Sequence, residues 1–414
     1  PNSIFGDYIS RILPELGEEN ICEMTLDDYA YRELSCYGEA QDKYDELEAV
    51  LHGKRPEETD YKQSREFVQE LDLFLMQQEW ENVDIQDFQY KKIVCPEEKI
   101  SKFFYETYCD VPMLARMEKI AEYLIDEQET LQNRDMEDEE KEKLLEKMKR
   151  MYVTRDPLEL YNRFLVESGR EEQLIQGQEI PYEDVYPLLY LKYTIDELPK
   201  RRRVKHVEID EMQDYSYIQY RILQKLFDCP MTILGDRKQT MGEKQINVMK
   251  FLPEIYGKEM FYIDMKKSYR STCEIMDFAE QILDRDSDTE YVDRHGERPH
   301  AVQVKSEEQM AECMTEDLRA GKEYRTQGVL CLTQEEADRF YRMLEKAGIE
   351  ADLLTKDSMK FHTGISVMPF YLAKGLEFDA VYVPNVQQYQ SPLEKQALYI
   401  NATRALHQLK LYEV

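Results

Sequence analysis

Two adjacent carboxylates after a short, partly apolar segment constrain the fold most strongly. Residues 204–209 lead directly into Asp210 and Glu211. In an open α/β sheet, ligands bind at the carboxyl ends of the strands, where an acidic pair could hold a magnesium–nucleotide complex. The alternative is a turn with solvated acids, since acidic residues are common in turns. Glu208 favours that alternative, because buried parallel strands usually form continuous apolar runs.

A second strand with a polar end follows about two dozen residues later. Residues 231–234 are apolar and run into residues 235–239, which have the composition of a tight turn. Strand, helix and strand with polar strand ends predict a βαβ unit of a parallel sheet. The helix between the strands is predicted from apolar residues on one face, namely Ile218, Ile222, Leu223, Leu226 and Phe227.

Three further polar blocks follow in the C-terminal part, at Lys267–Thr272, Ala373–Asp379 and Ala397–Ala405. Together with the two strand ends, these five blocks resemble, in order, the later motifs of the UvrD/Rep class of superfamily-one helicases. The resemblance covers nearly everything from about Tyr182 to the end of the chain.

Within that class the chain is most similar to the HelD branch, which is associated with RNA polymerase. The segments that carry this similarity lie at both sides of a long helical stretch. They are residues 1–9, residues 13–18, Asp156–Leu158, Tyr182–Asp184 and His206.

The resemblance implies an α/β fold with two RecA-like parallel-sheet domains and a helical insertion in the first, a helicase fold of the P-loop NTPase type. The chain starts at proline and contains no GxxxxGK[ST] loop, the element that cradles nucleotide phosphates. We therefore expect an N-terminally truncated fragment that does not hydrolyse ATP alone. The expected divisions are residues 1–20 (remnant of the first domain), 21–153 (helical insertion), 154–262 (first domain with the Mg/ATP motifs) and 263–414 (second domain).

The same resemblance implies roles for individual residues around ATP and Mg²⁺. Asp210 would hold Mg²⁺, Glu211 would be the catalytic base, and Gln239 would sense the γ-phosphate. Arg270 and Arg404 would reach the phosphates from the second domain, since an arginine fork stays charged and binds phosphate oxygens bidentately. For either arginine alone, a surface ion pair is the alternative.

The remaining implied contacts concern the nucleoside. Tyr269 would stack on adenine, Glu377 would contact the ribose, and Gly375 would approach the nucleotide closely. Lys374 and Gly375 can also be an ordinary turn, because glycine after lysine is common there.

Two departures from the UvrD/Rep pattern put DNA unwinding in doubt. Residues 240–245 contain neither the aromatic nor the arginine that engages single-stranded DNA in that class, and Tyr371 stands where the class has a histidine. The roughly one hundred residues from Arg270 to Lys374 leave no room for the large extra subdomain of UvrD and Rep.

Lys200–Arg203 is the one dense basic run, and it is either a phosphate contact or a solvated loop.

The charge balance favours a protein partner over bulk DNA. The chain has 54 Lys and Arg against 85 Asp and Glu, a net charge of −31, and nucleic-acid affinity depends on neutralising phosphates. DNA binding is therefore expected to be weak or local, and RNA polymerase is the suspected partner.

The eight cysteines show no metal-binding spacing, which is typical of a cytoplasmic protein. The chain has no apolar run that could span a membrane.

The long N-terminal stretch is predicted to be helical. Phe67, Leu71, Phe74 and Leu75 recur at helical spacing, and residues 126–150 form a charged helical hairpin or coiled-coil arm. That arm is either a solvated helical face or an acidic surface that contacts a partner.

In the second domain, alternating apolar segments predict strands at 301–304, 329–332, 365–368, 380–383 and 409–412.

Three functions remain open from the sequence. The first is the motor portion of a HelD-like ATPase that remodels nucleic-acid complexes, acting on RNA polymerase. The second is a 3′–5′ DNA helicase of the UvrD/Rep type. The third is a non-enzymatic acidic module that binds polymerase by resembling nucleic-acid charge.

Overall fold

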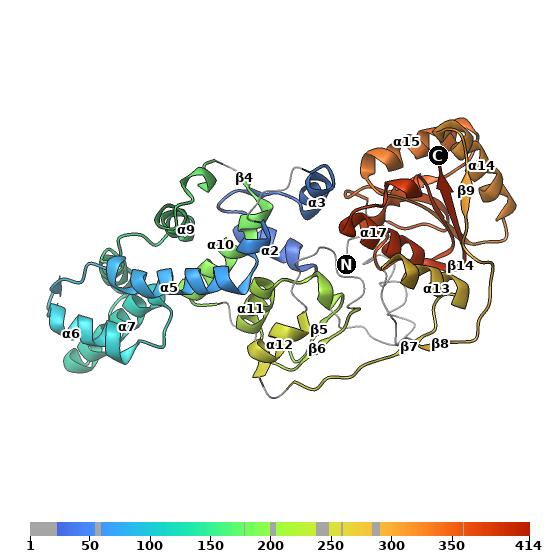
Figure 1. The fold of residues 1–414 in the computed structure, drawn as a ribbon. Helices are drawn as coiled ribbons and strands as arrows, with labels where there is room; N and C mark the ends of the chain where they lie inside the picture. The colour runs from blue at the N-terminus through green and yellow to red at the C-terminus, as the bar shows by residue number, and fades with distance from the viewer. Residues whose placement is uncertain are drawn as a thin grey trace.

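The structure is a computed structural model that describes residues 23–53, 59–177, 179–198, 204–236, 248–257, 260–283, 290–358 and 360–414. The fold is α/β, with parallel sheets and a RecA-like C-terminal region, as predicted (Figure 1). Three predicted features lie outside the described residues: the remnant at 1–20, the basic run Lys200–Arg203, and Gln239 with the polar segment after it.

Most helices of the N-terminal half share one hydrophobic core, whereas Tyr44, Leu47 and Leu51 pack against the core of the C-terminal region. Four of the helices begin at an oxygen-bearing side chain that accepts a backbone N–H, at Thr25, Asp42, Ser64 and Asp156. The α-helices are α2 (Leu26–Leu34), α3 (Lys43–Leu51), α4 (Thr59–Lys62), α5 (Arg65–Glu81), α6 (Glu97–Lys102), α7 (Met113–Gln132), α8 (Asp138–Lys149), α9 (Pro157–Glu167) and α10 (Tyr182–Ile195).

Short irregular elements connect these helices. Strand β1 (Glu39–Ala40) pairs in parallel with β4 (Glu179–Ile180), and β2 (Phe88–Tyr90) forms an antiparallel hairpin with β3 (Ile93–Cys95). A π-helical turn, η2 (Phe103–Thr107), continues α6, and a 3-10 turn, η3 (Glu171–Gln173), precedes β4.

The charged segment 126–150 is a helical hairpin rather than a projecting coiled-coil arm. Helices α7 and α8 pack together, and Asn133, with φ 51°, ends α7. Leu144 and Met148 of α8 are buried in the shared core, so only the outer side of the hairpin is solvated.

Helix α10 differs from the sequence-based interpretation. The apolar residues Leu188, Leu189, Leu191 and Ile195 by themselves predict packing on the sheet of the first domain. They are buried among helices instead, because α10 contacts α2, α5, α9 and α11 on different sides. A helix that is apolar all round indicates burial, not the element that buries it.

The predicted βαβ unit is present. Strand β5 (Val207–Ile209) pairs in parallel with β6 (Met231–Ile233), and α11 (Tyr217–Leu226) connects them. Helix α12 (Val248–Tyr256) packs on α11, and both contribute to the same core as the N-terminal helices. A 3-10 turn, η4 (Met212–Asp214), follows β5 and carries the polar residues after the acidic pair.

The C-terminal region contains a six-stranded, all-parallel sheet in the order β11-β12-β10-β13-β14-β9. All five strands predicted there are confirmed, and the sixth, the two-residue β11, was not predicted. The strands are β9 (Ala301–Gln303), β10 (Thr326–Cys331), β11 (Asp352–Leu353), β12 (Gly364–Pro369), β13 (Phe378–Val383) and β14 (Ala405–Glu413).

Helices cover both faces of this sheet (Figure 1). Successive strand residues alternate between the faces: Leu330 and Val381 join the cluster under α13 and α17, whereas Val329 and Tyr382 join the cluster under α14 and α15. The elements around the sheet are β7 (Lys267–Ser268), α13 (Cys273–Ile282), β8 (Glu290–Tyr291), α14 (Glu307–Ala320), α15 (Gln334–Lys346), α16 (Phe370–Ala373), η7 (Val386–Gln388) and α17 (Pro392–Thr403).

Strand β7 pairs in parallel with β8, which holds the segment before α13 in place.

Within the described part of the chain, no helix is both long enough and apolar enough to cross a membrane.

Candidate functional site

The acidic pair lies in the turn after β5, and both side chains are part-buried. Asp210 accepts a hydrogen bond on Oδ1 from the backbone N–H of Glu211 at 2.8 Å. Glu211 has φ 53° and ψ 47°, in the left-handed region that residues other than glycine rarely enter. Backbone strain of this kind concentrates at functional sites, where the surrounding structure holds it in place.

Gln213 attaches this turn to the end of β6. Its buried side chain donates to the Glu211 carboxylate, and its Oε1 accepts from the backbone N–H of Asp236 at 2.9 Å. Gly235 permits this approach, because a Cβ there would lie 2.6 Å from the backbone nitrogen of Met212. The ends of β5 and β6 therefore form one unit.

Lys374 connects that unit to the C-terminal region. It directly follows α16, and its Nζ lies 2.5 Å from Asp214 Oδ1 and 3.5 Å from Glu211 Oε2. The side chain is only 8% exposed. An ammonium group so far removed from water needs carboxylate partners to offset its desolvation. Gly375, the next residue, has φ 88°, so the turn after Lys374 requires a left-handed backbone.

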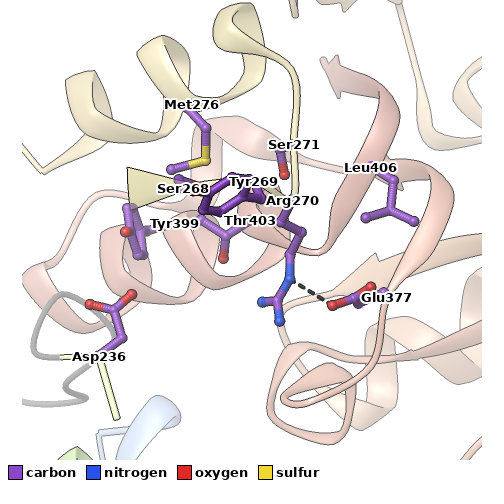
Figure 2. Close-up of a pocket in the computed structure, with 10 residues that line it drawn as sticks. All are labelled: Asp236, Ser268, Tyr269, Arg270, Ser271, Met276, Glu377, Tyr399, Thr403 and Leu406. Carbon is purple, nitrogen blue, oxygen red and sulfur yellow. Dashed lines mark ion pairs between the residues drawn. The ribbon is translucent and has the colours of Figure 1, made fainter. Parts of the chain in front are cut away.

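A pocket of about 530 Å³ opens between the end of β6 and the C-terminal region (Figure 2). Its size falls within the range of roughly 300–1,000 Å³ that is usual for small-molecule sites. Segments from β7, α13, α17 and the turn before β13 form its walls. The lining residues are Asp236, Ser268, Tyr269, Arg270, Ser271, Met276, Glu377, Tyr399, Thr403 and Leu406.

Three of the predicted site residues meet in this pocket: Tyr269, Arg270 and Glu377. Arg270 Nε lies 2.6 Å from Glu377 Oε1, as the dashed line in Figure 2 shows. The Arg270 side chain is 44% exposed and the Tyr269 residue 68% exposed, so a ligand could reach both. Asp236 faces them from the β6 side of the pocket.

Arg404 is buried at the end of α17, with 1% exposure. It donates from Nε to the Ile400 carbonyl oxygen at 3.3 Å. Burial, and next the positive charge of Arg270, lower the pKa of its guanidinium to about 10, against the opposing effect of Glu211. Two guanidinium groups that influence each other in a partly dry site provide a favourable environment for an anion.

The structure thus sorts the predicted residues into two groups. Tyr269, Arg270 and Glu377 line the pocket, whereas the acidic pair, Arg404 and Gly375 lie outside its lining. Gln239 lies outside the described residues.

Sequence reasoning missed the ion pair between Lys374 and Asp214, and also Asp236 and Tyr399 as lining residues. Asp236 stands at a predicted strand end and Tyr399 within a recognised block, so position in those motifs was an available signal. The pairing of Lys374 with Asp214 had none, because it joins residues 160 positions apart.

The carboxylates fit a magnesium ion that is shared with a nucleotide. Within the described ranges, no group of three or more His, Cys, Asp or Glu side chains is placed to hold a metal ion. Mg²⁺ is usually bound by one or two carboxylates together with waters and substrate phosphates. The two carboxylates of Asp210 and Glu211 suit a magnesium ion whose other ligands are waters and phosphates. They do not suit a site in which the protein supplies every ligand.

Residues 364–412, from β12 through most of β14, match the family model described as the UvrD-like helicase C-terminal domain. This part of the chain is therefore similar to a UvrD-like helicase C-terminal domain. Over 206 residues the chain is 22% identical to the ATP-dependent DNA helicase PcrA of Staphylococcus aureus (strain Mu50), covering 45% of this chain. The match covers 27% of that relative, so the chain spans about a quarter of its length. The chain is related to UvrD/Rep-type superfamily-one helicases.

Two solved structures are also similar. One is the C-terminal domain of a possible DNA helicase from Lactobacillus plantarum WCFS1, at 33% identity and a TM-score of 0.30, covering 36% of this chain and 88% of that one. The other is Arterivirus nonstructural protein 10 (helicase) with DNA, at 12% identity and a TM-score of 0.27, covering 51% and 40%.

Proposed function

We propose that this chain is the motor portion of a helicase-family ATPase that binds Mg²⁺–ATP between the β5–β6 unit and the UvrD-like domain. The observation that carries this proposal is the contact of Lys374 with Asp214 and Glu211. It brings the acidic strand end and the arginine-bearing domain to one cleft. Phosphoryl transfer depends mostly on positioning and charge neutralisation, which a cleft between two domains supplies.

The acidic turn would serve the metal and the attacking water. When bound, Mg²⁺ would neutralise charge on the nucleotide phosphates, and Asp210 would hold it. Glu211 would orient the water and take its proton, with the carboxylate kept in place by Gln213. Gln239 would sense the γ-phosphate.

The UvrD-like side would supply the cations and the nucleoside contacts. Arg270 would exchange its Glu377 partner for phosphate oxygens, and the buried Arg404 would add a second positive charge. Tyr269 has the exposure needed to stack on adenine, Glu377 would accept from the ribose hydroxyls, and Gly375 would let the backbone approach the nucleotide.

The test is ATP turnover by the full-length protein carrying Glu211→Gln. We expect turnover to fall by about 10²–10⁴-fold, the usual contribution of a positioned general base, while nucleotide binding is kept. Glu208→Gln is the matched control, because Glu208 is an exposed carboxylate on the same strand. Turnover of Glu211→Gln within about threefold of wild type, some 0.6 kcal/mol of barrier, would remove the base role.

We infer further that the motor acts in the manner of the HelD branch, on RNA polymerase, and not as a strand-tracking helicase. The support comes from Tyr371, which stands where UvrD and Rep have a histidine. Its hydroxyl donates to Glu48 Oε1 at 2.7 Å, and its ring stacks on Tyr44 with centroids 5.1 Å apart.

Helix α3, which carries Tyr44 and Glu48, covers this surface of the UvrD-like domain with acidic side chains. Glu48 also accepts from the backbone N–H of Gln334 at 2.8 Å, and Asp45 pairs with Lys356 at 2.6 Å. The carboxylates of α3 thus accept the hydrogen bonds that the phosphates of a nucleic acid would otherwise accept from this surface. With a net charge of −31, single-strand binding should be weak at this place.

Side-by-side titration of the full-length protein with a single-stranded oligonucleotide and with RNA polymerase, near physiological salt, tests the partner. We expect polymerase to bind more tightly. Submicromolar binding of the oligonucleotide with no detectable polymerase binding would instead support a DNA helicase of the UvrD/Rep type. Binding of polymerase with no ATP turnover would favour the non-enzymatic module.

A further inference from the structure

Helix α5 exposes an apolar stripe on the side that faces away from the core. Leu73, Met76 and Trp80 are 67%, 65% and 65% exposed. They are spaced at i, i+3 and i+7, so they lie along one face of the helix. The opposite face is already buried in the shared core through Phe67, Leu71, Phe74 and Leu75. The stripe is therefore additional to what folding requires.

A stacked aromatic pair makes one end of the stripe rigid. The Trp80 ring lies parallel to the Tyr105 ring, with centroids 4.0 Å apart and 9° between the planes. Tyr105 is presented by the π-helical turn η2, a distortion that often occurs at functional sites. Large aromatic side chains whose conformation is already fixed lose little entropy when a partner covers them.

The charged residues of the sequence around the stripe are acidic, and two of them, Glu79 and Glu70, pair with Arg116 and Arg170 from other helices and turns. Residues 66–90 contain seven acidic side chains and no lysine, arginine or histidine; the acids are Glu66, Glu70, Asp72, Glu79, Glu81, Asp84 and Asp87. Most of these are exposed beside the stripe or just beyond it. Such a border would repel a second copy of this chain, which carries a net charge of −31, and also a nucleic acid.

We propose that this face of α5 is a docking surface for a basic amphipathic helix of another protein. The apolar side of that helix would cover Leu73, Met76 and the Trp80–Tyr105 pair. Its lysines and arginines would meet Glu66 and Glu81 at the border, whereas Glu70 already pairs with Arg170 at 3.3 Å. Helices commonly bind this way, through anchors at helical spacing, while charges at the rim select the partner. The surface is separate from the proposed nucleotide cleft and does not depend on it.

The probe is a synthetic helix of leucine and lysine with leucine at i, i+3, i+4 and i+7. The chain has one tryptophan, so the emission of Trp80 reports directly on this face. We expect a blue shift on binding and saturation at one peptide per chain. The double variant Leu73→Gln/Met76→Gln should bind at least about tenfold more weakly, as expected for central interface anchors.

Leu131→Gln is the matched control, because Leu131 is 77% exposed but lies at the end of α7, outside this face. It should bind like wild type. All three substituted side chains are exposed, and far-UV circular dichroism confirms that the variants fold. A second peptide of equal charge, with serine in place of leucine, separates docking from charge attraction alone.

Three results of the peptide titrations would overturn the proposal. They are equal affinity of the double variant and wild type, equal binding of the serine peptide, and an unchanged Trp80 emission at saturation. Concentration-dependent self-association that the double variant abolishes would assign the face to a second copy of the chain and would equally overturn it.

Discussion

The C-terminal sheet region and the N-terminal helical region bury their apolar residues in different ways. In the former, a sheet separates two clusters, one under α13 and α17 and the other under α14 and α15. In the latter, one cluster extends from Tyr29 to Ile255, and the described strands β5 and β6 lie at its border. Strand hydrogen bonds fix neighbouring segments in register, whereas packed helices hold one another only through side-chain contacts.

This difference bears on the proposed site. Glu377 and Arg404 directly precede β13 and β14 of the six-stranded sheet, and Arg270 follows β7 of the separate β7–β8 pair. The acidic turn is positioned by two described strands and by Gln213. Its alignment with the arginines therefore depends on contacts between the regions. The described ones include the ion pairs of Lys374 at the cleft and the packing of α3, whose apolar residues Tyr44, Leu47 and Leu51 contact the C-terminal core.

The largest expected effect comes from opening a cavity in either core. Leu330→Ala in the sheet and Leu191→Ala in α10 remove fully buried side chains and should each lower the free energy of unfolding by about 2–5 kcal/mol. If the two regions unfold as separate units, each variant shifts only one transition in a urea titration followed by circular dichroism. Leu131→Ala, at an exposed position, should change stability by less than about 0.5 kcal/mol. A single transition shifted equally by both core variants would show one cooperative unit.

A moderate effect is expected at the contact between the regions. A double-mutant cycle with Lys374→Met and Asp214→Asn should give a coupling free energy of about 1 kcal/mol, since contacting residues couple by roughly 0.5–3 kcal/mol. The Lys374 side chain is 8% exposed and that of Asp214 34% exposed, so solvent screens the pair only in part. The exposed pair Lys143 and Glu139 is the control, with an expected coupling of about 0.3–0.5 kcal/mol. A Lys374 coupling no larger than that of the control would mean that the pair does not hold the two regions together.

The smallest effect concerns a histidine on the surface of the C-terminal region. Hydrogen bonds to Glu274 and then Asp293 raise the pKa of His295, and the same contact lowers the pKa of Glu274 to about 2. Because the folded pKa of His295 exceeds its unfolded value of about 6.5, its stabilising contribution is complete below that pH and is lost as the pH rises through the folded pKa. His295→Asn should therefore lower the urea midpoint slightly near pH 5.5 and hardly at all near pH 9. An NMR titration that places the His295 pKa at or below its ordinary value would contradict this expectation.

Local patterns in the sequence determined most of the C-terminal sheet. Five apolar segments separated by helical ones predicted five of the six parallel strands, because strand and helix periodicities are properties of neighbouring residues. The strand ends at Asp210 and Gly235 were predictable for the same reason. Only β11, with two residues, was too short to show a period.

Resemblance, and not periodicity, indicated the residues of the site, and the structure adds their surroundings. Tyr269, Arg270 and Glu377 meet in one pocket, although Glu377 is more than one hundred positions from the other two. The division of the chain at 20, 153 and 262 stays a prediction, and the shared core shows that the helices before and after residue 153 pack as one body.

Only the tertiary structure decided which distant segments of the chain contact one another. The pairing of Lys374 with Asp214, the placement of α3 over Tyr371, and the burial of α10 among helices have no local signature in the sequence. The left-handed backbone of Glu211 belongs to the same class, because a strained conformation persists only where the surrounding structure enforces it. Sequence determines which face of a segment is apolar and where its strands and helices end. Which other segment meets that face depends on the packing of the whole chain, since each such contact must compensate the entropy lost when distant residues are brought together.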